Sequence, residues 1–114
     1  MIPQIRPAQL AAWFEATRAE GRPVLLDVRE PGEMAAASVT PDARYDVVAI
    51  PMNSVPGRLA ELDPNRPLAV LCHHGARSQR VAQFLENQGF AQVANVAGGI
   101  DAWAVEHDSR VARY

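Results

Sequence analysis

One short stretch of the chain, residues 72–78, brings together side chains that can do chemistry. Its sequence is Cys-His-His-Gly-Ala-Arg-Ser, and its cysteine is the only one in the protein. An ionised thiol is a strong nucleophile, and a guanidinium close by binds anions. We therefore predict an active site in which Cys72 is the nucleophile. The loop that contacts the substrate would consist of His73, His74, Gly75, Ala76, Arg77 and Ser78.

The stretch lies between two elements that can hold it in place. Residues 67–71 are an apolar, partly β-branched run, which is typical of a buried parallel strand. Apolar residues recur at helical spacing from Ser78 up to Gly89, which predicts a helix that starts near Ser78. A loop between a strand end and a helix start points its backbone N–H groups inward, where they favour an anion. That anion can be the Cys72 thiolate itself, because helix N-termini and neighbouring cations favour thiolate formation.

Each of these residues also has a purely structural interpretation. A cysteine at the end of an apolar strand is more often a small buried hydrophobic residue than a nucleophile. Arg77 favours the nucleophile over the structural cysteine. A cation in the first turn of a helix opposes the helix dipole unless an anion compensates for it, so its presence suggests that the loop binds an anion. Ser78 is expected to act mainly as the N-cap of the helix. With one cysteine no internal disulfide forms, so any group that Cys72 accepts must pass to another molecule.

The two histidines of the loop are predicted to shape the pocket or to bind an incoming anion. The role of general base stays open for both His73 and His74. A zinc site is not expected, because consecutive residues rarely converge on one metal ion and no second ligand group lies elsewhere in the chain. We therefore expect neither a metal nor a bound cofactor.

The overall composition excludes several classes of function. The chain has 114 residues, of which 48% are hydrophobic and 21% are charged, and this is ordinary for one folded domain. A formal net charge of −2 gives no support for nucleic-acid binding. All 11 basic residues are arginine, so a catalytic lysine, a Schiff base and the lysine-containing Walker phosphate loop are excluded. No apolar run approaches about 18 residues and no secretion signal is present, so we expect a cytoplasmic protein that does not cross membranes.

The remaining hydrophobic pattern alternates strands with helices. Strands are predicted at residues 2–5, 24–28, 47–50, 67–71 and 92–96. Helices are predicted at residues 7–20, 33–37, 55–62, 78–89 and 100–106. This alternation indicates a small three-layer α/β domain with a mainly parallel five-stranded sheet flanked by helices. We expect one domain over residues 1–114, with a core from about residue 5 to about residue 106 and a polar tail, prone to fraying, at 107–114.

Charged residues gather at the end of the strand predicted at 24–28. Because parallel strands place their sites beyond their carboxyl ends, Asp27 and Arg29 should lie at the same edge of the sheet as Cys72. Their favoured role is a buried salt bridge that ties the loops together, and direct catalysis is the alternative. Glu30 is grouped with them as a supporting residue.

Four segments, spread in order over residues 24–103, carry a family resemblance. They are Leu-Leu-Asp-Val-Arg-Glu-Pro at 25–31, Ile-Pro at 50–51, the Cys72 loop, and Ala-Gly-Gly-Ile-Asp-Ala-Trp at 97–103. With them the chain resembles the single-domain rhodaneses, a family of rhodanese-like sulfurtransferases. The chain departs from the family at residues 37–41, where Ala-Ser-Val-Thr-Pro replaces the usual Gly-His-Ile-Pro-Gly-Ala. The rim of the pocket and the choice of donor therefore stay open.

The resemblance implies a two-step transfer of sulfane sulfur without a bound cofactor. Cys72 would take sulfur from a small donor such as thiosulfate, carry it as a transient persulfide, and pass it to cyanide, a thiol or a protein acceptor. Arg77, with His73 or His74, would hold the oxyanion part of the donor. The resemblance also implies that Asp27, Arg29 and Glu30 tie the loops together and that Trp103 packs beneath the last turn.

Two other functions stay open. The first is a partner-specific sulfur relay or protein-binding module, which would show weak activity on small molecules. The second is a phosphatase or an arsenate reductase, since relatives with a longer loop between the cysteine and the arginine accept phosphate or arsenate. Here only residues 73–76 separate Cys72 from Arg77, so a tetrahedral phosphoryl group should fit poorly.

Overall fold

Five strands form one parallel sheet in the computed structural model, which describes residues 1–114. In chain order the strands are β1 (Gln4–Ile5), β2 (Val24–Asp27), β3 (Asp46–Ala49), β4 (Leu68–Leu71) and β5 (Val93–Val96). Across the sheet the order is β1-β5-β4-β2-β3, and every neighbouring pair is parallel. The predicted α/β class and the mainly parallel five-stranded sheet are confirmed.

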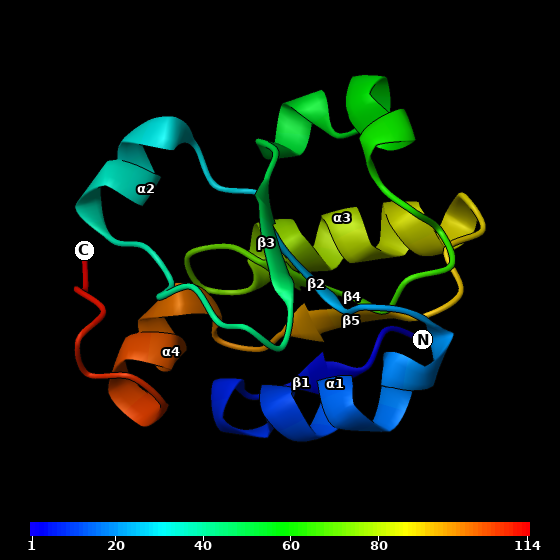
Figure 1. Cartoon of the computed structure of the whole chain (residues 1–114). Helices are drawn as coiled ribbons and strands as arrows, with labels where there is room; N and C mark the ends of the chain where they lie inside the picture. Colours follow the sequence, from blue (N-terminus) through cyan, green and yellow to red (C-terminus); the bar gives the residue numbers. More distant parts are fainter.

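Helices cover both faces of this sheet (Figure 1). The α-helices are α1 (Leu10–Thr17), α2 (Pro31–Ala36), α3 (Ala76–Asn87) and α4 (Gly99–Glu106), and the 3-10 turns are η1 (Pro7–Gln9), η2 (Arg18–Glu20), η3 (Met52–Ser54) and η4 (Pro56–Glu61). Helix α3 and residues 52–62 enclose one core, which includes Val70 and Leu85. Helices α1 and α4 enclose the other, which includes Phe14 and the buried Trp103. None of the helices has the length and apolar character needed to span a membrane.

All five predicted helices differ from the observed ones in their bounds, and the helix predicted at 55–62 also differs in type. The helix predicted at 55–62 is mostly the 3-10 turn η4, which has a non-helical residue at Arg58. Pro56 and Gly57 explain this, because proline removes a hydrogen-bond donor and glycine disfavours a regular helix. The helix predicted at 7–20 is α-helical only over α1, and its two ends tighten into 3-10 turns. Helix α2 begins earlier than predicted, at Pro31, since proline suits a first helical position.

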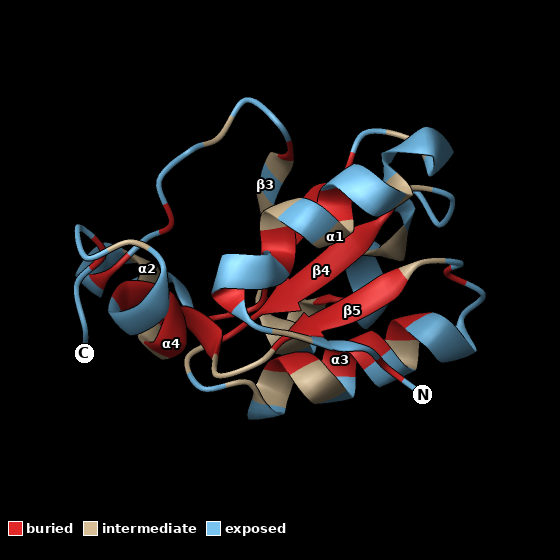
Figure 2. Ribbon diagram, turned by 90° about the horizontal axis from the view of Figure 1, so that it is seen from below, coloured by how far each residue is buried: buried red, intermediate tan, exposed pale blue.

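The register of the sheet places the carboxyl ends of the central strands side by side. Asp27 of β2 pairs with Leu71 of β4 and with Ala49 of β3. The Val28 N–H donates to the Leu71 carbonyl oxygen at 2.9 Å, so the pairing continues to the edge of the sheet. Strands β4 and β5 are buried along their length (Figure 2). Cys72, the residue after β4, therefore starts from a rigid position beside the residues that follow β2.

Helix α4 is anchored on the backbone of the Cys72 loop. The Ile100 N–H donates to the carbonyl oxygen of Cys72 at 2.9 Å, and the Asp101 N–H donates to that of His73 at 3.1 Å. The first N–H groups of a helix have no partner within the helix, so here the loop supplies the acceptors. Gly99 makes this approach possible, because a Cβ atom there would lie 2.5 Å from the Cys72 carbonyl oxygen and closer still to that of His73. Its φ of +61° also favours glycine.

The segment 107–114 is not the frayed tail that its polar composition predicts. Val111 is buried in the same core as Trp103. The Arg113 guanidinium donates to the Asp101 carboxylate at 2.9 Å and 3.2 Å. Figure 1 shows this end of the chain beside α2. The prediction is wrong because one apolar residue among charged ones has no periodicity by which a packed segment is recognised.

We expect Gly99→Ala to destabilise the protein by at least about 3 kcal/mol, because the new methyl group would collide with two backbone carbonyl oxygens that are held in place. Gly89 and Gly32 provide controls. Gly89 has a φ of +92° and open space around it, so Gly89→Ala should cost only the backbone strain of about 1 kcal/mol.

Gly32 has neither a positive φ nor a close neighbour, so Gly32→Ala should leave the free energy of unfolding unchanged or raise it by up to about 1 kcal/mol. Denaturant unfolding measures all three variants. A Gly99→Ala effect no larger than that of Gly89→Ala would contradict the close approach of α4 to the loop.

Candidate active site

Cys72 lies at the end of β4 and at the N-terminal end of α3. It is 1% exposed, and its Sγ accepts a hydrogen bond from the Gly75 N–H at 3.0 Å. Gly75 is the N-cap of α3 and closes the loop with a φ of +106°, which favours glycine. Ala76 is the first residue of α3 and is exposed. The predicted placement of Cys72 between a strand and a helix start is confirmed, and the Gly75 N–H and the N-terminal end of α3 present partial positive charge to Sγ.

The prediction that Ser78 caps the helix is wrong, because α3 begins before it. Ser78 is fully buried, and its Oγ lies 3.2 Å from Cys72 Sγ and 2.5 Å from Asn95 Oδ1. Sequence reasoning misses Asn95, which is buried in β5. The signal that could have found it is an amide within an apolar strand, since a buried amide needs hydrogen-bond partners.

The hydrogen bonds of Asn95 determine where the protons of this cluster lie. Its Nδ2 donates to the Gly75 carbonyl oxygen at 3.1 Å, and that oxygen can only accept. The Asn95 Oδ1 atom therefore faces Ser78, whose hydroxyl must donate to it. In the thiol state the Cys72 S–H then donates to Ser78 Oγ. In the thiolate state the Gly75 N–H donates to Sγ, and the Ser78 hydroxyl can join it only by turning away from Asn95.

Arg77 forms a bidentate ion pair with Glu33 of α2, with N–O distances of 2.6 Å and 2.7 Å. The two side chains are 31% and 22% exposed, so the pair is partly shielded from water. The Arg77 guanidinium lowers the pKa of Glu33 to about 2, and Glu33 in turn raises the pKa of Arg77. The predicted position of Arg77 in the first turn of the helix is confirmed, but the anion beside it is Glu33.

Sequence reasoning misses Glu33, which is recognised only as part of a short helix. The signal that could have found it is its place in the first turn of α2, at the edge of the sheet where Cys72 lies. An acidic residue there is well placed to pair with a cation that the loop presents.

Asp27 and Arg29 form a buried salt bridge, which agrees with the interpretation that the sequence favours for these two residues. The Arg29 guanidinium is fully buried and donates to both Asp27 carboxylate oxygens, with its shortest contacts at 2.7 Å and 2.9 Å. Its Nη1 atom donates to the Glu33 carbonyl oxygen at 3.2 Å, which ties the end of β2 to α2. Glu30 contributes differently, because its side chain is exposed and its backbone N–H donates to Glu33 Oε1 at 3.1 Å.

His73 and His74 lie at the rim of the site in an aromatic stack. The His73 ring is stacked between the rings of His74 and Tyr114, with centroid separations of 3.9 Å on both sides. His73 Nε2 is buried and has no hydrogen-bond partner. The hydrogen bonds of Cys72 Sγ involve only Gly75 and Ser78, so the resting structure gives no support to a histidine general base.

A third side chain that can bind metals lies close to the two histidines. The ligand atoms of His73, His74 and Asp101 lie within 4.8 Å of one another, so the expectation that no further ligand group joins the histidines is wrong. The two rings are stacked, however, with their planes 25° apart, so their in-plane lone pairs lie in nearly parallel planes. Asp101 is also held by Arg113. These residues could hold one metal ion only after the rings rotate apart and the ion pair opens.

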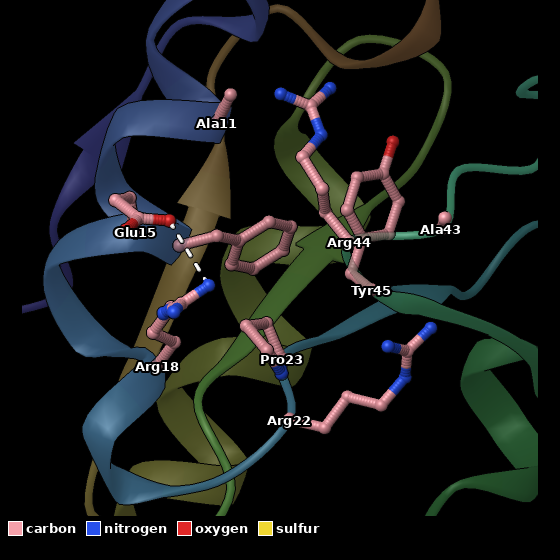
Figure 3. A pocket seen from close by; sticks show the side chains of 9 residues that line it. Ala11, Glu15, Arg18, Arg22, Pro23, Ala43, Arg44 and Tyr45 are labelled. Carbon is pink, nitrogen blue, oxygen red and sulfur yellow. Dashed lines mark ion pairs between the residues drawn. The ribbon is translucent and has the colours of Figure 1, made fainter.

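A cavity of about 260 Å³ lies away from the Cys72 loop, between α1 and the residues that precede β2 and β3 (Figure 3). Its larger side chains are Phe14, Tyr45, Arg18, Arg22 and Arg44. Each guanidinium has a carboxylate partner within 3.6 Å. Because these charges are compensated and no nucleophile lines the cavity, it offers no chemistry of its own.

We expect Glu33→Gln to lower the free energy of unfolding by about 1–2 kcal/mol near pH 7, because Arg77 loses its charged partner and solvent screens part of the effect. This loss should depend on pH. The pKa of Glu33 falls from its ordinary value near 4.5 to about 2 on folding, so its stabilising effect is full above about pH 5 and is lost as the pH falls towards 2. The difference between wild type and variant should therefore shrink over this range.

Glu86→Gln is the control, because Glu86 lies on the exposed side of α3 with an amide, that of Gln83, as its hydrogen-bond partner. We expect it to change the free energy of unfolding by less than about 0.5 kcal/mol. Urea unfolding at several pH values measures both variants. A Glu33→Gln difference that stays constant down to about pH 2 would show that the ion pair is not its cause.

Comparison with known proteins agrees with this arrangement. Residues 10–106 match the family model of the rhodanese-like domain. A sulfurtransferase of Allochromatium vinosum is 38% identical over 81 residues, which are 71% of this chain and 71% of that protein. The thiosulfate sulfurtransferase GlpE of Pseudomonas entomophila is 34% identical over 98 residues, which are 86% of this chain and 84% of that protein.

A solved structure shares the fold as well. A rhodanese-related protein of Thermoplasma volcanium is 30% identical to this chain, with a TM-score of 0.73, and the match covers 92% of this chain and 93% of that chain. The family model includes the Cys72 loop, Glu33 and Asn95, and it ends before Tyr114. On its sequence, its fold and the geometry around Cys72, the chain belongs to the rhodanese-like domain family.

Proposed function

We propose that this protein is a sulfurtransferase that moves sulfane sulfur from a small donor to a thiophilic acceptor through a persulfide on Cys72. The observation that carries the proposal is the environment of Sγ, which lies at the N-terminal end of α3 and accepts the Gly75 N–H at 3.0 Å. The names of two relatives, a sulfurtransferase and a thiosulfate sulfurtransferase, support this class of reaction. The proposed cycle uses no metal and no bound cofactor.

In the first step the Cys72 thiolate attacks the outer sulfur of thiosulfate. A bond forms between these two sulfur atoms, the S–S bond of the donor breaks, and sulfite leaves with the electron pair. The product is a persulfide anion on Cys72. The Gly75 N–H and the positive end of α3 stabilise its charge, and the Ser78 hydroxyl adds a second hydrogen-bond donor when it turns from Asn95.

In the second step an acceptor attacks the terminal sulfur of the persulfide. Cyanide takes that sulfur as thiocyanate, the S–S bond breaks, and the electron pair returns to Cys72 as a thiolate. A thiolate acceptor leaves as a new persulfide in the same way. Because Cys72 is almost fully buried, both reactants must approach past the rim formed by His73, His74 and Arg77.

Arg77 is the residue that we assign to the oxyanion part of the donor. Its guanidinium has five N–H groups, and Glu33 accepts through one on each terminal nitrogen. The remaining N–H groups can bind a sulfonate oxygen while the ion pair stays closed. Glu33 therefore acts as the support on which Arg77 is held.

A partner-specific sulfur relay is the second candidate, and the burial of Cys72 favours it. A protein donor can offset the cost of opening the loop through its own contacts, which a small ion cannot make. A phosphatase reaction is disfavoured, because only residues 73–76 separate Cys72 from Arg77 and a tetrahedral phosphoryl group should fit this short loop poorly.

Incubation with thiosulfate should raise the intact mass of the protein by one sulfur atom, about 32 Da, and cyanide should then remove it with release of thiocyanate. Cys72→Ser should stay folded and gain no mass, because a hydroxyl cannot form the persulfide. Mass spectrometry of the intact chain and a thiocyanate assay measure both steps.

Alkylation by iodoacetamide tests in parallel whether the thiol is reactive. No gain of mass in a protein that is still alkylated would favour the partner-specific relay. Retention of most of the transferase activity in Cys72→Ser would contradict the nucleophile assignment. Hydrolysis of an aryl phosphate that depends on Cys72 would favour the phosphatase reaction instead.

A further inference from the structure

The segment 107–114 lies outside the residues that the family model matches, yet one of its side chains reaches the site. The Tyr114 hydroxyl donates to Glu33 Oε2 at 2.8 Å and accepts from Arg29 Nη1 at 3.1 Å. Its ring stacks on that of His73, with centroids 3.9 Å apart and planes 10° apart. Tyr114 therefore contacts both chain segments that form the site, the one after β2 and the one after β4.

Contacts along the segment hold Tyr114 in place. The Val111 side chain is buried, and its N–H donates to the Asp108 carbonyl oxygen at 3.1 Å. Arg113, next to Tyr114, forms two hydrogen bonds with the Asp101 carboxylate of α4. A tyrosine on a segment that is already ordered has less conformational entropy to lose, so its hydroxyl can hold a partner firmly.

Glu33 connects Tyr114 to Arg77, the residue that we assign to the anionic donor. Its Oε2 accepts from Arg77 Nη2 at 2.7 Å as well as from Tyr114, and its Oε1 accepts from Arg77 Nη1 and from the Glu30 N–H. Of the groups that hold this carboxylate, only Tyr114 comes from outside the loops of the site. The place of the carboxylate determines where Arg77 points, because the ion pair is bidentate.

We propose that Tyr114 is a positioning residue for sulfur transfer, which holds Glu33 and thereby keeps Arg77 where it binds the anionic donor. This inference rests on the proposed function of Cys72 and adds to it a residue from beyond the family model. Tyr114 makes and breaks no bond in the reaction. Its hydroxyl matters for donor binding and not for the removal of sulfur by cyanide, which has no oxyanion group for Arg77 to bind.

The test separates the two half-reactions. Persulfide formation is followed by intact mass at increasing thiosulfate concentration, and sulfur removal by cyanide is followed on protein that was loaded beforehand. Tyr114→Phe keeps the ring that stacks on His73 and removes the hydroxyl. We expect the thiosulfate concentration for half-maximal loading to rise about three- to tenfold, while the maximal loading rate and the cyanide step change by less than about twofold.

Two further variants show whether the effect passes through Glu33. In the Glu33→Gln background, Tyr114→Phe should have little further effect on loading, because the carboxylate that its hydroxyl holds is gone. Tyr45→Phe is the matched control, because it removes the same atom from a tyrosine that lines the cavity away from Cys72 (Figure 3). It should leave both half-reactions unchanged.

An unchanged half-saturating thiosulfate concentration in Tyr114→Phe would overturn the inference. Equal losses in both half-reactions would overturn it too, since they would indicate a general loss of structure. An additive loss in the Glu33→Gln background would show that Tyr114 does not act through Glu33. If the wild-type protein gains no sulfur from thiosulfate, the proposed thiosulfate reaction is wrong and this inference is overturned with it. If the wild-type protein is loaded normally and Tyr114→Phe has no effect, only this inference is overturned.

Discussion

The contact between the N-terminus of α4 and the backbone of the Cys72 loop is the constraint on which the site depends. Two N–H groups of α4 use the carbonyl oxygens of Cys72 and His73 as acceptors, and the glycine at position 99 lets the two backbones approach. These carbonyl groups are held towards α4, while the N–H of Gly75 points to Sγ. The packing of α4 thus helps to hold the carbonyl and N–H groups of the loop in their orientations around the sulfur, although α4 itself supplies no nucleophile.

Charged groups join the other walls of the site to this backbone. Arg29 tolerates complete burial because Asp27, a backbone carbonyl and the Tyr114 hydroxyl all accept its N–H groups. A buried ion pair contributes little net stability, but its directed hydrogen bonds define how the loop after β2 sits on α2. Arg77 and Glu33 repeat this arrangement nearer to solvent, where the guanidinium keeps N–H groups for an anion.

The proposed nucleophile and the arginine proposed to bind the donor are therefore supported by different parts of the chain. Cys72 depends on buried neutral groups, with Ser78 and Asn95 on one side and the Gly75 N–H on the other. Arg77 depends on a carboxylate in α2 and, through it, on the segment 107–114. The environment of the sulfur and the position of Arg77 therefore rest on separate sets of contacts.

Local patterns in the sequence were enough to predict the architecture and the place of the site. Hydrophobic periodicity with glycine and proline at the ends of elements predicts the alternating strands and helices. Parallel strands then bring Asp27, Arg29 and Cys72 to one edge of the sheet. The bounds of the helices were less well predicted, because whether a short segment becomes α or 3-10 depends on what it packs against.

Local patterns along the chain were sufficient to predict the candidate nucleophile, the loop that carries it and the edge of the sheet where it lies. The partners of these side chains emerge only from the folded structure, because they lie far apart in the chain: Ser78 meets Asn95 across 17 positions, Arg77 meets Glu33 across 44, and Tyr114 meets Glu33 across 81. Sequence patterns report side chains within about one helical turn or one strand repeat of each other. Contacts over longer separations arise from packing, which brings distant segments together through burial and leaves no periodic trace in the sequence.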